Sequence, residues 1–137
     1  MSDCIFCKIV RGEIPCHKIF ENEKILAFLD VNPLNEGHTL VIPKGHYETI
    51  FDMDEQLSGE LMKVVWKISN VLKKQLEPDG LNLLQNNYAP AGQLVPHFHF
   101  HLIPRFINDD VPVGKWVMVP GDHERLAKLK EQLSPYL

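Results

Sequence analysis

The clearest pattern along the chain is a run of apolar residues at helical spacing between residues 57 and 76. Apolar side chains that recur every three or four positions share one face of a helix and bury it against a core. Asp52 or Asp54 can cap the start of this helix, and residues 77–80, with their proline and glycine, end it. The pattern therefore predicts one long amphipathic helix. Its buried positions are Leu57, Leu61, Val64, Val65, Ile68, Leu72 and Leu76.

Several shorter segments are rich in β-branched and aromatic residues and end at proline, glycine or polar turns, as strands do. Two short helices complete the pattern, over residues 4–11 and Asp122–Gln132. The order of helix, three strands, helix, two strands and helix predicts an α+β fold with a five-stranded, mostly antiparallel sheet. We expect the long helix on one sheet face and an open opposite face. The predicted strands are Ile19–Phe20, Ile25–Val31, His38–Pro43, Leu81–Asn86 and Phe98–Phe106.

Three histidines alternate with large apolar residues in the last predicted strand. Side chains on a strand alternate between its faces, roughly 6.6 Å apart along each face. His97, His99 and His101 would therefore form a row on one face, while the residues between them point into the core. Neighbouring histidines can share a metal ion that activates water, or one neutral imidazole can attack phosphorus while its neighbours orient it. In the second case the central His99 is the natural nucleophile.

Composition narrows the setting of this chemistry. The 137 residues suffice for one core and show no repeat or linker, which predicts a single domain over residues 1–137. A net charge of -4 predicts no general affinity for nucleic acid polymers. We expect no membrane association and a cytoplasmic location, because no apolar run reaches roughly 18 residues and the first residues lack an export pattern. Three cysteines, an odd number, argue against a disulfide framework.

Cys4 and Cys7 form a C-x-x-C motif, which by itself has three interpretations. It can be a redox pair, half of a zinc site, or two small buried residues. No second such motif completes a four-cysteine site, so any further ligands would be histidines. His46 and His97 are the best candidates for them. We expect Cys16 to be a packed thiol.

Three further features could contact a ligand. The loop 86–93 brings small residues and amides close to the histidine strand, which suits a phosphate or ribose against backbone N–H groups, and an ordinary connector is an equal alternative. Asp30 could accept hydrogen bonds from ribose hydroxyls or cap the turn that follows it. Arg105 could hold a phosphate or be a solvated surface residue.

Together these motifs resemble the histidine triad (HIT) family of nucleotide-binding proteins, in particular its short Hint-like prokaryotic branch. His97–Ile103 fits the alternating histidine signature of the family, and the C-x-x-C segment, Gly37–His46 and the pair Gly92-Gln93 resemble its other motifs. The resemblance covers residues 3–107 in unbroken order and leaves residues 108–137 as a tail. It implies the HIT-like fold, a five-stranded sheet with one long helix and shorter helices, in a homodimer whose sheets join edge to edge.

The resemblance also implies a substrate class and a mechanism. The substrates would be purine nucleotides, as nucleoside phosphoramidates, aminoacyl adenylates or dinucleoside polyphosphates, and a covalent nucleotidyl-histidine would form during hydrolysis. His99 would attack the α-phosphorus, and His101 would contact the phosphate and help with proton transfer. The other implied nucleotide-binding residues are Ile5, Phe6, Ile9 and Phe28 at the base, Asp30 at the ribose, and Asn86, Gly92 and Gln93 near the phosphate.

Zinc-containing members of the family use four ligands at the positions of Cys4, Cys7, His46 and His97. All four are present in this chain, so the resemblance implies a closed, structural Zn²⁺ site. His97 would then orient the triad from the metal side, and the metal would not touch the phosphate.

The chain departs from the family pattern at Leu94, where Hint proteins usually place a serine or threonine that contacts the leaving group. This departure motivates a second hypothesis, a nucleotide-binding regulatory protein with weak or no catalysis. A third hypothesis is a hydrolase whose histidine row holds a catalytic metal, which would leave Cys4 and Cys7 unexplained. Histidine at the third triad position, where galactose-1-phosphate uridylyltransferases have glutamine, favours hydrolysis over nucleotide exchange.

Overall fold

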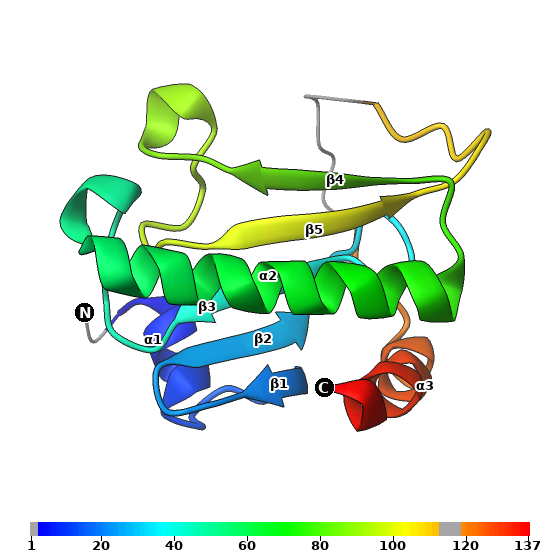
Figure 1. The fold of residues 1–137 in the computed structure, drawn as a ribbon, viewed down its shortest axis with the longest axis horizontal. Helices are drawn as coiled ribbons and strands as arrows, with labels where there is room; N and C mark the ends of the chain where they lie inside the picture. The colour runs from blue at the N-terminus through cyan, green and yellow to red at the C-terminus, as the bar shows by residue number, and fades with distance from the viewer. Residues whose placement is uncertain (1–2, 113–118) are drawn as a thin grey trace.

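The computed structural model describes residues 3–112 and 119–137, so residues 113–118 of the predicted tail lie outside the described part. Five strands form one antiparallel sheet in the order β1-β2-β3-β5-β4, and a long helix crosses one face of it (Figure 1). The predicted α+β fold is therefore confirmed. The elements in chain order are α1 (Ile5–Val10), β1 (His17–Glu21), β2 (Ile25–Leu29), β3 (Thr39–Pro43), η1 (Ile50–Asp52), α2 (Glu55–Leu76), β4 (Gly80–Gln85), η2 (Ala89–Ala91), β5 (Phe100–Arg105), α3 (His123–Leu133) and η3 (Ser134–Tyr136).

The long helix α2 forms where the apolar spacing predicts it. Of the two candidate caps, Asp54 caps the helix, because its side chain accepts a hydrogen bond from Leu57 N–H at 2.8 Å. Asp52 instead belongs to the capping box of η1. The helix ends at Glu77, whose backbone is left-handed with φ 51°. No helix within the described residues is long and apolar enough to cross a bilayer.

The main core lies between α2, α3 and one face of the sheet. The alternation in the histidine segment is confirmed here, since Phe98 and Leu102 are buried in this core and Phe100 packs against it. The helix α3 lies beside β1 and adds one apolar face (Figure 1). The helical residues of this core are Leu57, Leu61, Val64, Val65, Ile68, Leu72, Leu126, Leu129 and Leu133.

The expectation of an open opposite sheet face is wrong over β2 and β3. A second apolar cluster lies there, where Phe6 and Cys7 of α1 pack against Phe28, Leu40 and their neighbours on β2 and β3. These two strands are buried along their whole length, because helices cover both of their faces. The sequence does not reveal this packing because a six-residue helix is too short for apolar periodicity to define a face.

The strand β5 begins at Phe100, two residues later than predicted. Residues 95–97 bend after Val95, with His97 N–H donating to the Val95 carbonyl at 2.8 Å, and Phe98 N–H donates to the Tyr47 carbonyl. His97 and His99 therefore lie on the segment that leads into β5, and only His101 lies within the strand. The other strands are confirmed with shifted ends; for example, β1 is longer than predicted and β2 ends two residues earlier.

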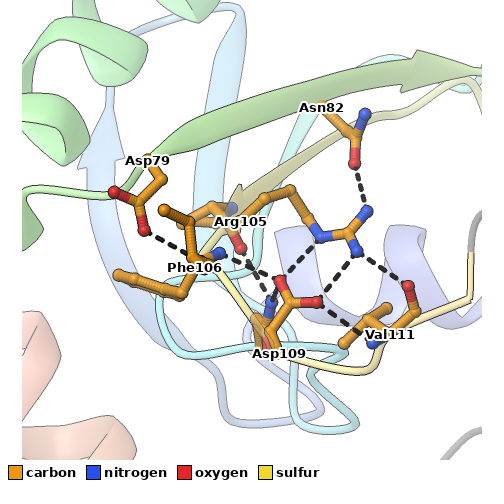
Figure 2. A network of polar contacts seen from close by, with 9 residues as sticks. Asp79, Asn82, Arg105, Phe106, Asp109 and Val111 are labelled. Atoms are coloured by element: carbon orange, nitrogen blue, oxygen red, sulfur yellow. Dashed lines mark hydrogen bonds and ion pairs between the residues drawn. The ribbon is translucent and has the colours of Figure 1, made fainter.

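Figure 2 shows a polar network around Arg105 at the end of β5. Arg105 donates from Nε and Nη2 to the Asp109 carboxylate at 2.9 and 3.0 Å, and from Nη1 to Asn82. The guanidinium holds the pKa of Asp109 well below its usual range. Asp109 also accepts a hydrogen bond from Asn35 Nδ2 at 2.8 Å. Through Asp109, Arg105 thus holds the loop between β2 and β3, which follows Asp30. Arg105 does not line the cavity beside α1 and the histidine segment.

Candidate active site

A cavity of about 430 Å³ opens between α1, the ends of β2 and β3, and the segment that leads into β5. Small-molecule sites typically enclose about 300–1,000 Å³. The residues of α1 and residues 14–16 give it apolar walls, while residues 30–38 and the histidine segment bring polar groups. The sequence-predicted residues that line it are Ile5, Phe6, Ile9, Phe28, Asp30, Gly92, His99 and His101.

Asn86 and Gln93, the other two predicted nucleotide-binding residues, do not line the cavity. Gln93 donates from Nε2 to the carbonyls of Glu48 and Val95 at 2.7 and 3.0 Å, and its Oε1 accepts from Tyr88 N–H at 2.6 Å. Asn86 Nδ2 reaches the carbonyl of the loop glycine at 3.4 Å. Both amides hold the loop 86–95 in shape, and a contact of either with phosphate stays a prediction.

His99 is held in one tautomer by the backbone. Its Nδ1 lies 2.7 Å from the carbonyl oxygen of His97. A carbonyl can only accept, so Nδ1 carries the proton and the lone pair of the neutral ring is on Nε2. The ring is buried and meets the Phe6 ring edge-on at a centroid distance of 5.2 Å. The fold therefore presents a fixed, unprotonated nitrogen at a residue that lines the cavity.

His38 extends this arrangement to His101. The N–H of Leu34 donates to His38 Nδ1 at 3.0 Å, so the proton of a neutral His38 is on Nε2. That nitrogen lies 2.9 Å from His101 Nδ1 and 3.6 Å from the Asp30 carboxylate. His101 Nδ1 must then accept, which places its own proton on Nε2. The direction of each hydrogen bond follows from one backbone N–H.

Burial keeps these imidazoles neutral. Desolvation lowers the pKa of His38, His99 and His101 below the ordinary value, because a charged ring loses more hydration than a neutral one. The pKa of His101 falls to about 2, since the positive charges of His99 and His38 would add repulsion to the cost of burial. Asp30 opposes the shift at His38 and His99. A neutral ring is the form that can act as a nucleophile.

The four predicted metal ligands come together beside this site. The Sγ of Cys4 lies 3.4 Å from His97 Nδ1, and the Sγ of Cys7 lies 3.3 Å from His46 Nδ1 and 3.6 Å from His97 Nδ1. The four ligand atoms all lie within 4.8 Å of one another. The ligands come from α1, from the segment after β3 and from the bend before β5, so the cluster joins three distant parts of the chain.

The chemistry of this cluster fits zinc. Around a tetrahedral Zn²⁺ with the usual bond lengths, neighbouring sulfur and nitrogen ligands lie about 3.5 Å apart, as they do here. His97 Nε2 donates to the Pro43 carbonyl at 2.9 Å, which directs the unprotonated Nδ1 at the thiols, as in many metal sites. Burial raises the pKa of the Cys7 thiol, so a metal cation is needed to hold it as thiolate at neutral pH. All three cysteines are free of disulfides.

Comparison with known proteins matches this geometry to a family. The model of the HIT domain family matches residues 11–108, which is most of the chain. The chain belongs to the HIT family. It is 45% identical to an uncharacterized HIT-like protein of Borreliella burgdorferi, over 98% of both chains. It is also 41% identical to an adenosine 5'-monophosphoramidase of Candida albicans, over 99% of this chain and 92% of that protein.

Solved structures of HIT proteins share the fold. A HIT-like protein of Bartonella henselae, crystallised with an unknown ligand, superposes with a TM-score of 0.90 at 33% identity, over 100% of this chain and 98% of the other. A zinc-bound histidine triad protein of Mycobacterium smegmatis superposes with a TM-score of 0.85 at 32% identity, over 98% and 93% of the two chains. The five-stranded sheet and its helices are thus those of a HIT protein.

The sequence predicts His38 only as the start of a strand and does not reveal its role in this HIT site. Pairing of β3 with β5 places Leu40 opposite His101, so His38 is a diagonal neighbour on the same face. Alternation along β3 therefore contains the signal. The pairing of the two strands, which sequence alone does not give, is needed to use it.

These assignments predict the proton positions directly. Long-range ¹H–¹⁵N NMR of the metal-free protein at pH 7 is expected to show His99 protonated on Nδ1, and His38 and His101 on Nε2. At pH 5 His101 is expected to remain neutral, whereas a free imidazole with a pKa of about 6.5 is mostly charged. Unfolded chains take up that proton, so the free energy of unfolding should fall as the pH drops below about 6.5. Protonation of His101 near pH 6 would contradict the assignment.

Proposed function

We propose that the chain is a nucleotide hydrolase or nucleotidyl transferase that acts on purine nucleoside phosphoramidates or dinucleoside polyphosphates through a covalent nucleotidyl-His99. The observation that carries the proposal is the bond from His99 Nδ1 to the His97 carbonyl, which leaves Nε2 as a nucleophile. The Candida albicans relative, named as an adenosine 5'-monophosphoramidase, supports the substrate class.

The reaction would proceed in two displacements. The lone pair of His99 Nε2 attacks the α-phosphorus, the bond to the leaving nitrogen or phosphate oxygen breaks, and the leaving group departs with the bonding electrons. A leaving nitrogen also takes up one proton, which His101 would help to transfer, and departs as the amine. The hydrogen bond from His99 Nδ1–H to the His97 carbonyl stabilises the positive charge that develops on the ring. Water then attacks the same phosphorus and releases one proton to the solvent, and the phosphorus–nitrogen bond breaks to release the nucleoside monophosphate and neutral His99.

The other residues would bind the nucleotide and stabilise charge. His101 donates from Nε2–H to a phosphate oxygen in the transition state. The hydrogen bond from His38 Nε2–H to His101 Nδ1 orients its ring for this contact. Asp30, beside the polar end of the cavity, accepts hydrogen bonds from the ribose. The base packs among Ile5, Phe6, Ile9 and Phe28, which line the apolar part. Gly92 brings backbone close to the phosphate, in a loop that Asn86 and Gln93 support.

The nucleophile is tested by His99→Ala. Turnover of adenosine phosphoramidate should fall by at least about a thousandfold, since the covalent step is lost, while AMP should still bind. Mass spectrometry of the quenched wild type should find one nucleotidyl group on His99. The conservative variant Lys18→Arg, a surface change on β1, should keep the wild-type rate. Wild-type turnover by His99→Ala would refute the mechanism.

A second candidate, a nucleotide-binding regulatory protein, is favoured by one observation. Leu94 lines the cavity, is 74% exposed, and offers no hydroxyl to a leaving group. The same assay separates the two functions: tight AMP binding by the wild type with no turnover of any phosphoramidate or dinucleoside polyphosphate would support the regulatory function.

We infer further that Cys4, Cys7, His46 and His97 hold one structural Zn²⁺. The ion would fix α1 to the bend before β5, because its ligands come from both. The zinc-bound Mycobacterium smegmatis relative and the ligand spacing support this assignment.

Zinc content is tested by elemental analysis of the purified protein, with about one ion per chain expected. Cys7→Ser should lose the metal and lower the unfolding temperature, because metal binding energy is folding energy at such sites. Cys16→Ser, the matched control, should retain both. If a chelator removed the metal from the wild type without lowering its unfolding temperature, a structural role for the metal would be contradicted.

We also infer that the protein forms a homodimer through the outer edge of β4. That strand pairs only with β5 among the described residues, whereas the β1 edge lies beside α3. Leu83 on β4 is 46% exposed, and the exposed rings of Phe51 and of Tyr88, which follows the end of β4, stack on each other. An apolar, unpaired edge strand favours pairing with a second copy.

The dimer is tested by sedimentation equilibrium. Leu83→Lys should convert the dimer to monomer, since a charge on the edge opposes pairing. Val119→Lys, an exposed apolar position elsewhere, should leave the assembly unchanged. A wild-type protein that is monomeric at high micromolar concentration would overturn this proposal.

A further inference from the structure

A pair of histidines borders the cavity outside the catalytic group. His17 at the start of β1 and His123 at the start of α3 face each other, with His17 Nε2 and His123 Nδ1 at 3.2 Å. His123 lines the cavity, together with Cys16, the neighbour of His17. Residue 123 lies beyond the part of the chain that matches the HIT family model. The pair therefore joins one residue within the family match to one residue beyond it.

The helix that carries His123 is firmly held. Leu126, Leu129 and Leu133 anchor it in the main core. Just before it, Gly121 N–H donates to the Val31 carbonyl at 2.7 Å, and a Cβ at this glycine would meet the Pro33 ring at 2.7 Å. Close contact thus fixes the start of α3 against the loop that follows β2. His123 is therefore held in the cavity wall by the packing of its own helix.

The position of the pair suggests what it contacts. The apolar residues of α1 and residues 14–16 form the part of the cavity where, by the proposed function on which this inference rests, the purine base lies. Apolar walls bind every purine alike and discriminate little between them. His123 brings an imidazole to this part, where hydrogen bonds to the edge of the base would decide between purines.

The pair can present either sense of hydrogen bond. One proton lies between His17 Nε2 and His123 Nδ1, because two lone pairs at 3.2 Å would repel. If His17 donates it, the neutral ring of His123 carries its own proton on Nε2 and can donate to a ligand. If His123 donates from Nδ1, its Nε2 has a lone pair and can accept. Among the described residues, Nε2 of His123 has no hydrogen-bond partner.

We propose that His123, backed by His17, contacts position 6 of the purine ring and admits both 6-amino and 6-oxo purines. The amino group of adenine donates at that position, whereas the oxygen of guanine or hypoxanthine accepts. A reversible pair satisfies both. When the shared proton moves from His17 Nε2 to His123 Nδ1, His123 Nε2 gives up its proton and His17 Nδ1 takes one up from water, so both rings stay neutral and the sense of Nε2 is reversed. His17 is neutral at physiological pH, because burial and the positive charges of His123 and Lys130 lower the pKa of its imidazole.

The test fixes the direction of the hydrogen bond between residue 17 and His123 and measures which purine base the site prefers. AMP and IMP share the same phosphate and differ only along one edge of the base, at position 6 and in the proton that hypoxanthine carries on N1, so their ratio of dissociation constants reports on the base edge alone. At pH 8.5 the carboxylate introduced by His17→Glu can only accept a hydrogen bond, so His123 donates to it from Nδ1. This leaves a lone pair on His123 Nε2, which should favour AMP. The ammonium introduced by His17→Lys can only donate, so His123 accepts at Nδ1. This leaves a proton on His123 Nε2, which should favour IMP. Each ratio should move by about three- to tenfold, the effect of one partly solvated hydrogen bond.

The matched background is His123→Phe, which keeps a ring and removes both nitrogens. In that background His17→Glu and His17→Lys should no longer change the AMP to IMP ratio, because they act through His123. A general effect of the new charges on phosphate affinity would change both dissociation constants equally and cancel in the ratio.

The outcomes separate this inference from the proposed function. If the wild type binds neither AMP nor IMP, both fail. If both nucleotides bind but the two His17 variants leave the ratio unchanged, or move it in the same direction, the inference fails and the proposed function stands. Persistence of the shifts in the His123→Phe background would also overturn the role of His123.

Discussion

The bend that places His97 is the feature on which the rest of the site depends. One residue makes three contacts there: its carbonyl accepts from His99 Nδ1, its Nε2 donates to the Pro43 carbonyl, and its Nδ1 faces the thiols of Cys4 and Cys7. The first contact sets the tautomer of the proposed nucleophile. The other two fix the backbone that supplies this contact. The candidate metal cluster and the candidate active site are therefore joined through His97.

Hydrogen-bond direction is the second constraint, and it begins at a backbone group in each case. The Leu34 N–H sets the proton of His38, which sets that of His101, while the His97 carbonyl sets that of His99. Burial then keeps the rings neutral, as their lowered pKa values indicate. Backbone groups do not titrate, so they set the same proton positions at every pH at which the rings are neutral.

The loop between β2 and β3 connects this site to the periphery of the fold. Asn35 in that loop donates to Asp109, within the network that Arg105 organises, and Glu36 pairs with Arg125 of α3. The loop carries Asp30 and leads into His38. The C-terminal helix, which lies outside the HIT family match, thus helps to shape a cavity whose catalytic groups lie within it.

Several features followed from the sequence alone. The helical periodicity of α2, the alternation around the histidines and the ligand spacing of Cys4, Cys7, His46 and His97 are local or motif-like, so they predicted the architecture and a candidate metal cluster. Other features were decided by tertiary structure, because they depend on which segments meet. The burial of the second sheet face by α1, the partnership of His38 with His101, and the contact of His17 with His123 across 106 positions depend on strand pairing and helix packing. A linear pattern does not say which of these distant residues meet, because that depends on how the strands pair and how the helices pack.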